Sequence, residues 1–354
     1  MGKIETDHTG SGGGITLSSD GTSLLLDGTA IGGGGGGDPD LYRDNETAGA
    51  TTPSATGGNA VSIGNASSSS GLLSIAFGYA ATSTAQCSTA IGASSGLAGS
   101  RAIANGAVAL GGSSASGVNS FAAAIGGNSA GYGAQGANSI AIGLNAEAEA
   151  GNSIAIGSYN VSRGDGSVSL GYSNDVSGTG AVAIGSNHWN PSFEHTQSRG
   201  VYAKPWAHAA DVWSSGRFSS TGDAQSTKIV LRAETTDATP KAMAIDGYSS
   251  TYAQLNIVPK SAWAFTAMIV AREDATDGTD SAAWKIEGLV RMEASHATAV
   301  LVGSATTVLS NVPNWNATVS ADTTNGILKF EATGAAATNV RFVATINTSE
   351  VIYA

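Results

Sequence analysis

An apolar residue followed by glycine recurs at short, nearly regular intervals between residues 59 and 185. The glycines of successive pairs are 14, 14, 19, 15, 17, 14, 14 and 14 residues apart. The fullest copies read Asn-Ser-Ile-Ala-Ile-Gly, at 138–143 and 152–157. Self-similarity at a short period indicates a solenoid. The apolar members of the nine pairs are Ile63, Phe77, Ile91, Leu110, Ile125, Ile142, Ile156, Leu170 and Ile184.

Each copy of the motif predicts two short strands. Its two isoleucines stand two positions apart, so both face the same side of a strand, and the Ala or Ser between them is small enough for another layer to approach. After the glycine comes a second run of alternating small residues, as at 145–151. Glycine is expected at turns with positive φ or crowded corners. The alternative, a disordered Gly/Ser linker, is disfavoured by the regular phase of the apolar residues.

One copy contains too few apolar residues to bury a core, so stacked copies must share one, and neighbouring chains would bury more. The Asn-Ser-Ile-Ala-Ile-Gly module closely resembles the head repeat of trimeric autotransporter adhesins (YadA-like heads). The resemblance implies a left-handed parallel β-roll at 51–186, with three chains around one axis and the nine apolar residues facing the shared interior. It leaves function open, because one fold serves many functions.

The last part of the chain, 217–354, has the alternation and turn signals of an antiparallel β domain, and an all-β chain is expected overall. All six tryptophans follow the repeats. Many short strands at this spacing predict a β-sandwich or jelly-roll knob. Residues 187–216 are expected to form a neck, where aromatic side chains fill irregular volume between chains. The predicted strands are 227–233, 254–258, 262–272, 282–294, 297–302, 315–321, 327–333 and 340–353.

A second resemblance concerns this C-terminal region. It resembles domains of structural proteins of tailed phages through Ser-Gly-Arg-Phe at 215–218, Thr-Asp-Ala-Thr at 236–239 and Ala-Asp-Thr-Thr-Asn-Gly at 321–326. This resemblance implies a phage tail fibre that carries YadA-like head repeats.

The N-terminal region, 1–50, is expected to attach the fibre to other virion proteins. Alternating apolar runs around Asp20-Gly21 predict a hairpin at 15–28, and the six glycines at 32–37 predict a flexible tether. The chain start has no apolar signal core, and neither a coiled-coil stalk nor a membrane anchor is recognisable. These features favour a virion protein made in the host cytoplasm over a bacterial surface adhesin.

Composition narrows the partners further. The chain is acidic, with a net charge of −11, and only 12% of its residues are charged. Nucleic acid and anionic membranes are therefore disfavoured, since both require clusters of Lys and Arg. The single cysteine, Cys87, is expected to be a small buried residue. Glu147 and Glu149 are interpreted as a solvated face of the repeat rather than as an acid/base pair.

Catalytic and metal chemistry find little support in the sequence. His188, His195, His208 and His296 lack metal-binding spacing, although His195 or His208 of three chains could meet on a trimer axis. We expect no metal, no cofactor and no enzymatic activity. The alternative is autoproteolysis of the C-terminal domain, which needs an activated side chain beside a base. The candidates for that reaction are Ser214 or Ser219 with Lys204 or Asp223.

These observations predict a homotrimeric fibre of a tailed bacteriophage whose distal C-terminal domain binds the host surface. The expected receptor is a polysaccharide or lipopolysaccharide, and Tyr248 and Tyr252 are the candidate contact residues. Three sites on one rigid trimer would gain affinity through avidity. Two alternatives stay open. One is a non-adhesive virion fibre of the neck, capsid or baseplate, whose C-terminal domain only registers the trimer, and the other is a bacterial surface adhesin.

Overall fold

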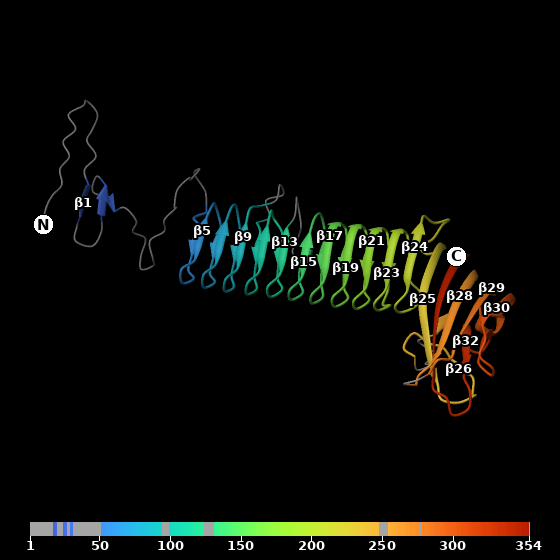
Figure 1. Cartoon of the computed structure of the whole chain (residues 1–354). Helices are drawn as coiled ribbons and strands as arrows, with labels where there is room; N and C mark the ends of the chain where they lie inside the picture. Colours follow the sequence, from blue (N-terminus) through green and yellow to red (C-terminus); the bar gives the residue numbers. More distant parts are fainter. Residues whose placement is uncertain are drawn as a thin grey trace. The chain divides into compact units, whose positions relative to one another are not determined.

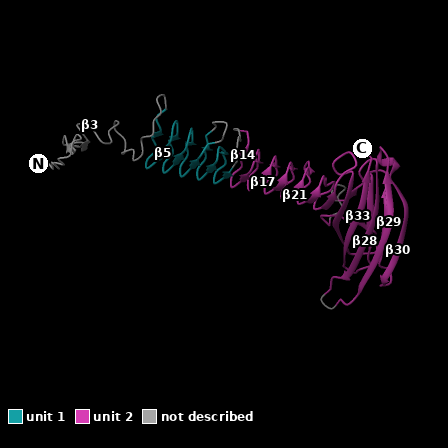
Figure 2. Ribbon diagram, turned by 90° about the horizontal axis from the view of Figure 1, so that it is seen from above, with its two compact units in different colours: residues 1–130 teal, residues 131–354 magenta. Residues whose placement is uncertain are grey.

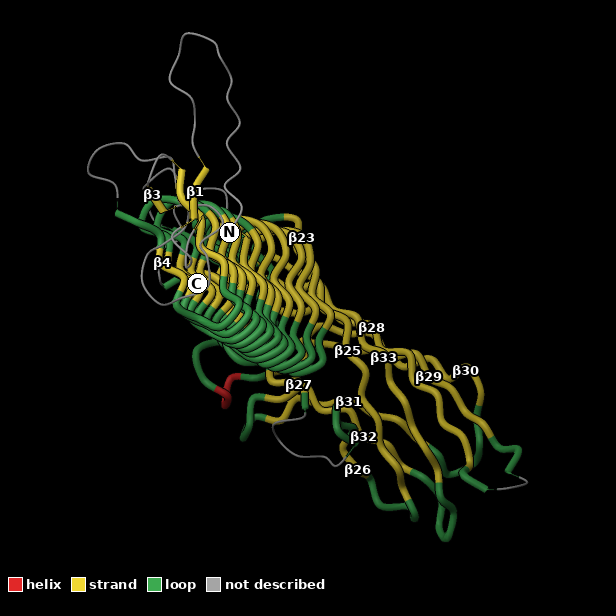
Figure 3. Tube along the Cα trace, turned by 90° about the vertical axis from the view of Figure 1, so that its left-hand side faces the viewer, coloured by secondary structure: helices red, strands yellow, loops and turns green. Residues whose placement is uncertain are grey.

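The computed structural model of the chain describes residues 51–93, 99–123, 131–247, 254–275 and 278–353, together with the backbone of three short N-terminal strands. These residues form an all-β structure whose chain divides into two compact units, Met1–Ala130 and Gly131–Ala354 (Figure 2). In the described ranges the one helical segment is the 3-10 helix η2, His296–Thr298 (Figure 3). No helix in them is long and apolar enough to cross a membrane.

The three N-terminal strands form a small antiparallel sheet in the order β1-β2-β3. Strand β1 (Leu17–Ser19) pairs with β2 (Leu24–Leu26), which in turn pairs with β3 (Thr29–Ala30). The antiparallel pairing predicted for 15–28 is therefore confirmed. The predicted glycine tether at 32–37 lies outside the described residues.

In the first unit, the repeats form two parallel ladders of very short strands (Figure 1). One ladder contains two-residue strands: β4 (Ser54–Ala55), β6 (Ser68–Ser69), β8 (Thr82–Ser83), β10 (Arg101–Ala102) and β12 (Ser114–Ala115). The other contains three-residue strands: β5 (Val61–Ile63), β7 (Ile75–Phe77), β9 (Thr89–Ile91), β11 (Val108–Leu110) and β13 (Phe121–Ala123).

The second unit contains the same arrangement. One ladder has β14 (Gly133–Ala134), β16 (Glu147–Ala148), β18 (Val161–Ser162), β20 (Asp175–Val176) and β22 (Trp189–Asn190). The other has β15 (Ile140–Ile142), β17 (Ile154–Ser158), β19 (Val168–Tyr172), β21 (Val182–Ser186), β23 (Gln197–Val201) and β24 (Asp211–Ser215). The parallel β-solenoid predicted from the repeat is therefore present.

The turn from 138 to 151 shows why the motif has its composition. Asn138 and Asn145, seven positions apart, both have positive φ, at 57° and 53°. Asparagine tolerates this left-handed region better than most residues. Between these corners, Ala141 points into the roll and is buried, whereas Ile140 and Ile142 point outward. The interior of the roll is thus built from Ala and Ser, because two sheets this close leave no room for larger side chains.

The glycine of each pair occupies a second constrained position. Gly157 and Gly171 have φ of +114° and +119°. A Cβ atom on Gly157 would lie 1.9 Å from the carbonyl oxygen of Gly171, and one on Gly171 would lie 2.1 Å from that of Gly185. Both reasons predicted for glycine, positive φ and a crowded corner, are confirmed at these positions.

The predicted apolar residues align in register within each unit. In the first unit Ile63, Phe77, Ile91 and Leu110 pair in sequence. Ile142, Ile156, Leu170 and Ile184 do the same in the second unit. Ile125 itself lies outside the described residues, and the residue opposite Leu110 is Ala123. The in-register residue of this turn is therefore Ala123, whereas the apolar-Gly pattern had selected Ile125, two positions later in the sequence.

The solenoid of the second unit continues directly into an antiparallel sheet. Strand β24 pairs antiparallel with β25 (Ala224–Thr235), with Asp211 opposite Lys228. The sheet then runs in the order β25-β33-β28-β29-β30 (Figure 3). The added strands are β28 (Ser261–Glu273), β29 (Ser281–Met292), β30 (Val300–Ser310) and β33 (Val340–Ile352).

A smaller sheet packs against this large one. Strand β32 (Ile327–Thr333) pairs with β26 (Lys241–Ala242), β27 (Leu255–Asn256) and β31 (Asn316–Asp322). Both sheets contribute to one apolar core, in which Phe265 and Phe330 meet edge to face with ring centroids 5.7 Å apart. The indole rings of Trp263 and Trp284 are fully buried in the same core.

Most predicted C-terminal strands occur within a few residues of their expected bounds. The exception is 297–302, where η2 precedes the longer strand β30. β30 is exposed along most of its length, so it lacks the alternation that burial imposes on its neighbours. The region expected to form a neck, 187–216, contains β22, β23 and β24, which continue the parallel pairing of the solenoid.

Two expectations about single side chains are wrong. Cys87 is exposed, not buried, because it occupies a turn position with φ of +56°, where the side chain points away from the roll. Trp206, expected to fill volume between chains, packs inside one chain. Its ring stacks on Trp263 with centroids 4.3 Å apart, where the end of the solenoid meets the antiparallel sheets.

Candidate functional site

A cleft of about 800 Å³ lies in the second unit, where the last turns of the solenoid meet the antiparallel sheets. Its lining comes from β22, the loops between β23 and β24 and between β24 and β25, β27, η2 and the turn between β31 and β32. Its volume lies within the range of roughly 300–1,000 Å³ that is usual for ligand pockets. The cleft is therefore the candidate binding site among the residues that the structure describes.

The lining of the cleft is mainly apolar, with a few polar groups. Such a surface suits an amphipathic ligand, whose orientation the polar groups determine. The apolar residues are Trp189, Pro191, Phe193, Pro205, Trp206, Ile257, Val258, Pro259, Ile327 and Ile352. The polar or small ones are Lys204, Ser220, Thr221, Gly222, Asp223, Asn256, His296, Asn325 and Gly326.

Lys204 and Trp189 form the most distinctive contact of the cleft. The Lys204 ammonium nitrogen lies 4.3 Å from the centroid of the Trp189 ring, a cation–π distance. No ion pair joins Lys204 to a carboxylate of the described residues, and partial burial lowers the pKa of its ammonium below the ordinary value. The Trp189 side chain remains 44% exposed. A cation and an accessible aromatic ring are therefore in contact in the lining of the cleft.

A buried hydrogen-bond network holds the loop that carries Lys204. Gln225 binds both the backbone N–H and the carbonyl oxygen of Lys204, at 3.1 and 3.0 Å. The Glu350 carboxylate accepts hydrogen bonds from Gln225 Nε2 at 2.9 Å and from Trp206 Nε1 at 2.8 Å. Thr348 Oγ1 also donates to Glu350. The two antiparallel strands β25 and β33 thus determine where the Lys204 loop lies.

Burial has a large electrostatic effect on Glu350. The carboxyl group is almost fully enclosed, and desolvation raises its pKa above the ordinary value of 4.5. Hydrogen bonds from Thr348, Gln225 and Trp206 oppose this shift but do not cancel it. Because desolvation disfavours the charged form, burial keeps Glu350 protonated over a wider pH range than an exposed glutamate.

Three further polar side chains line the cleft at β27, η2 and the turn before β32. The side chains of Asn256 and His296 are exposed, and neither makes a hydrogen bond to another described residue. Asn325 instead donates to the Asp322 carboxylate at 2.8 Å, so its amide is partly committed to the turn. Asn256 and His296 are therefore available to a ligand.

His188 is structural. It is buried and belongs to a column with Asn160 and Asn174, spaced by 14 residues. Asn174 Oδ1 accepts from the His188 backbone N–H at 3.0 Å, and His188 Nδ1 accepts from the Ala203 N–H at 3.0 Å. Its Nε2 therefore carries the hydrogen and donates to the Ile184 carbonyl at 3.1 Å. Burial lowers the pKa of the imidazole, consistent with a neutral ring.

The other histidines lie apart in the chain. His208 Nδ1 accepts from the Glu194 backbone N–H at 3.1 Å, and its ring meets Phe193 edge to face. His195 occupies a turn with φ of +55°. Across the ranges that the structure covers, no group of three or more His, Cys, Asp or Glu residues could hold a metal ion. Whether His195 or His208 meets its counterparts in a trimer stays a prediction.

The candidates for autoproteolysis are only partly brought together. The Asp223 carboxylate accepts hydrogen bonds from the backbone N–H groups of Phe218, Ser219 and Ser220 and from the Ser219 hydroxyl at 3.3 Å. Although burial opposes it, these bonds lower the Asp223 pKa, which makes the carboxylate a weaker base. Ser214 Oγ lies 2.6 Å from the Gly216 carbonyl oxygen and 2.8 Å from that of Ala224. Both serines thus serve local turn structure.

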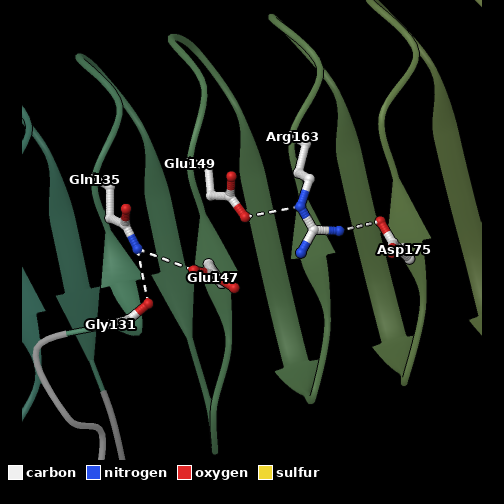
Figure 4. A network of polar contacts seen from close by, with 6 residues as sticks. All are labelled: Gly131, Gln135, Glu147, Glu149, Arg163 and Asp175. Atoms are coloured by element: carbon white, nitrogen blue, oxygen red, sulfur yellow. Dashed lines mark hydrogen bonds and ion pairs between the residues drawn. The ribbon is translucent and has the colours of Figure 1, made fainter. Parts of the chain in front are cut away.

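The solenoid of the second unit has two outer faces of opposite character. The face formed by β15, β17, β19 and β21 carries the outward-pointing isoleucines and valines, of which Ile184 is 47% exposed. The other face carries a polar network (Figure 4). There Arg163 pairs with Glu149 at 2.9 Å and with Asp175 at 2.5 Å. Glu147 and Glu149 are half-exposed on this face, where Gln135 donates to Glu147 and Arg163 pairs with Glu149 from adjacent turns.

No pattern in the sequence predicts the cleft. Tyr248 and Tyr252, the candidate receptor contacts, lie outside the described residues. Trp189 and Lys204 were visible only as parts of a supposed neck. The sequence does mark these two residues, because their large side chains interrupt the Ala- and Ser-rich pattern of the repeat. Asn256 and His296, by contrast, are too distant in sequence to be associated with them.

Comparison with known proteins identifies the repeat. A family model described as the YadA head domain repeat (2 copies) matches residues 69–95, 134–160 and 162–187. The chain carries YadA head repeats. The matched segments span strands of both ladders, among them β7, β15 and β19, so the repeat and the parallel ladders are the same feature. No curated protein matches the chain.

One solved structure with some likeness is a tailspike protein, gp49, from Acinetobacter baumannii bacteriophage Fri1, described as a capsular polysaccharide depolymerase. The two are 10% identical, with a TM-score of 0.25, over 60% of this chain and 39% of the tailspike chain. A likeness at this level constrains neither the fold nor the function of this chain.

Proposed function

We propose that this chain is the subunit of a trimeric, adhesive fibre of a tailed bacteriophage, and that its C-terminal region binds a glycan on the host surface. The observation that carries the proposal is the joining of YadA head repeats to a domain with a cleft. The sheet of the repeats continues through β24 and β25 into that domain, so the binding region is rigidly connected to its support. In this proposal the repeats are a shaft and the N-terminal region attaches to the virion.

Competition for adsorption tests the attachment role. Purified full-length chain, added to host bacteria before the phage that encodes it, is expected to reduce phage adsorption in proportion to its concentration. Antibody against 217–354 is expected to block adsorption as well, whereas antibody against 1–50 serves as the control. If neither the chain nor the first antibody changes adsorption, the chain is a non-adhesive virion fibre and the proposal fails.

The trimer is supported by the apolar outer face of the solenoid. An exposed row of large apolar residues that repeats on most turns has a large area to bury, and regularly stacked copies of the same chain match its period. The opposite face is satisfied by ion pairs, so it has less to gain from a partner. We infer that Ile142, Ile156, Leu170 and Ile184 of the second unit, with Ile63, Phe77, Ile91 and Leu110 of the first, face the trimer interior.

Charge on the apolar face is expected to prevent assembly. The double substitution Ile156→Asp and Ile184→Asp places carboxylates where the trimer would exclude water, and burying an unpaired charge is strongly unfavourable. Light scattering should give a trimer mass for the wild-type chain and a monomer mass for the variant. Glu149→Ala, on the opposite face, is the matched control and should remain trimeric. A monomeric wild-type chain would disprove the trimer.

A further inference from the structure

The cleft of the second unit contains a cation, Lys204, that forms no ion pair with a carboxylate of the described residues. Lys204 is half-buried, and the Trp189 ring is its one charge-stabilising contact among the described residues. Its neighbour in the cleft, Asp223, is already engaged by three backbone N–H groups. A cation that is partly removed from water without a counter-ion gains from binding an anionic ligand group.

The surroundings of Lys204 indicate the rest of the ligand. Trp189, Pro191, Phe193 and Pro259 present flat apolar surfaces that fit the C–H faces of a sugar ring. The exposed side chains of Asn256 and His296 also line the cleft and are free to bind hydroxyl groups. A flat ligand with apolar faces, several hydroxyls and one negative charge matches the apolar surfaces, the polar side chains and the Lys204 ammonium of the cleft.

We propose that the cleft binds an acidic saccharide, in which a carboxylate pairs with Lys204 while the sugar ring packs beside Trp189. Nucleic acid is disfavoured as the ligand of the cleft, because its phosphates require a cluster of Lys and Arg, whereas Lys204 is the one such residue in the described lining. A compact carboxylate suits a lysine, which acts as a point charge. This inference rests on the proposed attachment function and specifies the class of its receptor.

Binding of full-length chain to a glycan array tests the inference. The array carries uronic- and sialic-acid oligosaccharides beside the same oligosaccharides with their carboxyl groups reduced to alcohols. Wild-type chain should bind at least one acidic member and lose that binding on its reduced counterpart. Lys204→Met keeps the aliphatic stem and removes the charge, so it should weaken the binding by about tenfold or more. Binding to no acidic member, or equal binding to the reduced forms, overturns the proposal.

Arg217→Met is the matched control. Arg217 also lies over an aromatic ring, at 4.0 Å from the centroid of Tyr202, but it does not line the cleft. This variant should bind acidic glycans as the wild type does, and both variants should keep the wild-type Tm. If Lys204→Met and Arg217→Met weaken binding equally, the effect is one of net charge and the cleft is not the site.

The adsorption assay separates this inference from the attachment function. If Lys204→Met chain competes with phage adsorption as well as wild-type chain does, the receptor binds elsewhere and the cleft proposal fails alone. If wild-type chain binds acidic glycans through Lys204 but does not compete, the cleft proposal stands and the attachment function fails.

Discussion

Alanine at position 157 is expected to unfold the solenoid of the second unit or to destabilise it by more than about 4 kcal/mol. Gly157 has φ of +114°, where an L-residue is strained, and its Cβ would lie 1.9 Å from the carbonyl oxygen of Gly171. The clash is with backbone, which neighbouring turns hold on both sides, so it cannot be relieved by rotating a side chain. Thermal unfolding followed by circular dichroism measures the change.

Gly166→Ala is the matched control for this prediction. Gly166 also has positive φ, at +62°, but a Cβ added there would meet no atom within 4 Å. Gly166→Ala should therefore lower the free energy of unfolding by only about 1–2 kcal/mol, the cost of placing an L-residue at positive φ. The difference in stability between the two variants measures the effect of the steric clash between successive turns. Equal Tm values for Gly157→Ala and Gly166→Ala would show that the turns are not as tightly stacked as the structure indicates.

Replacing Glu350 by alanine is expected to destabilise the chain by about 3 kcal/mol, because two buried donors lose this acceptor and only Gln225 keeps another, the Lys204 carbonyl oxygen. These donors are Trp206 Nε1 and Gln225 Nε2, at 2.8 and 2.9 Å from the carboxylate. The loop that carries Lys204 should loosen as well. Glu350→Gln is the matched control, since its amide oxygen can accept both bonds without a buried charge. Urea unfolding at neutral pH measures both variants.

The wild-type chain and Glu350→Gln should also differ in pH dependence. The pKa of Glu350 is raised in the folded state, so the folded chain binds more protons than the unfolded chain above pH 4.5. Wild-type stability from this group is therefore complete below pH 4.5 and is lost as pH rises through the folded-state pKa. Glu350→Gln lacks this loss, so its Tm relative to the wild type should rise from pH 4.5 to pH 8. A relative Tm that falls with rising pH would contradict the raised pKa.

The solenoid could be predicted from the sequence because it depends on local conformational preferences. Whether a residue accepts positive φ, as at Asn138 and Gly157, depends mainly on that residue, and alternation along a strand is a property of a few neighbours. The strands from 224 onward were recognisable for the same reason. Where alternation fails, the prediction failed too, as at β30, which packs with almost nothing on either face.

The repeat was sufficient to predict strands, turns, small residues where two layers approach and an in-register row of isoleucines, because each follows from a period of about 14 residues and from side-chain size. Only the tertiary structure determined which residues meet where the solenoid joins the antiparallel sheets. The cleft collects residues from Trp189 to Ile352, and the network at Glu350 joins Trp206 and Gln225 across 144 and 125 positions. No local pattern encodes such contacts. The unpaired charge of Lys204 likewise depends on what the fold places around it.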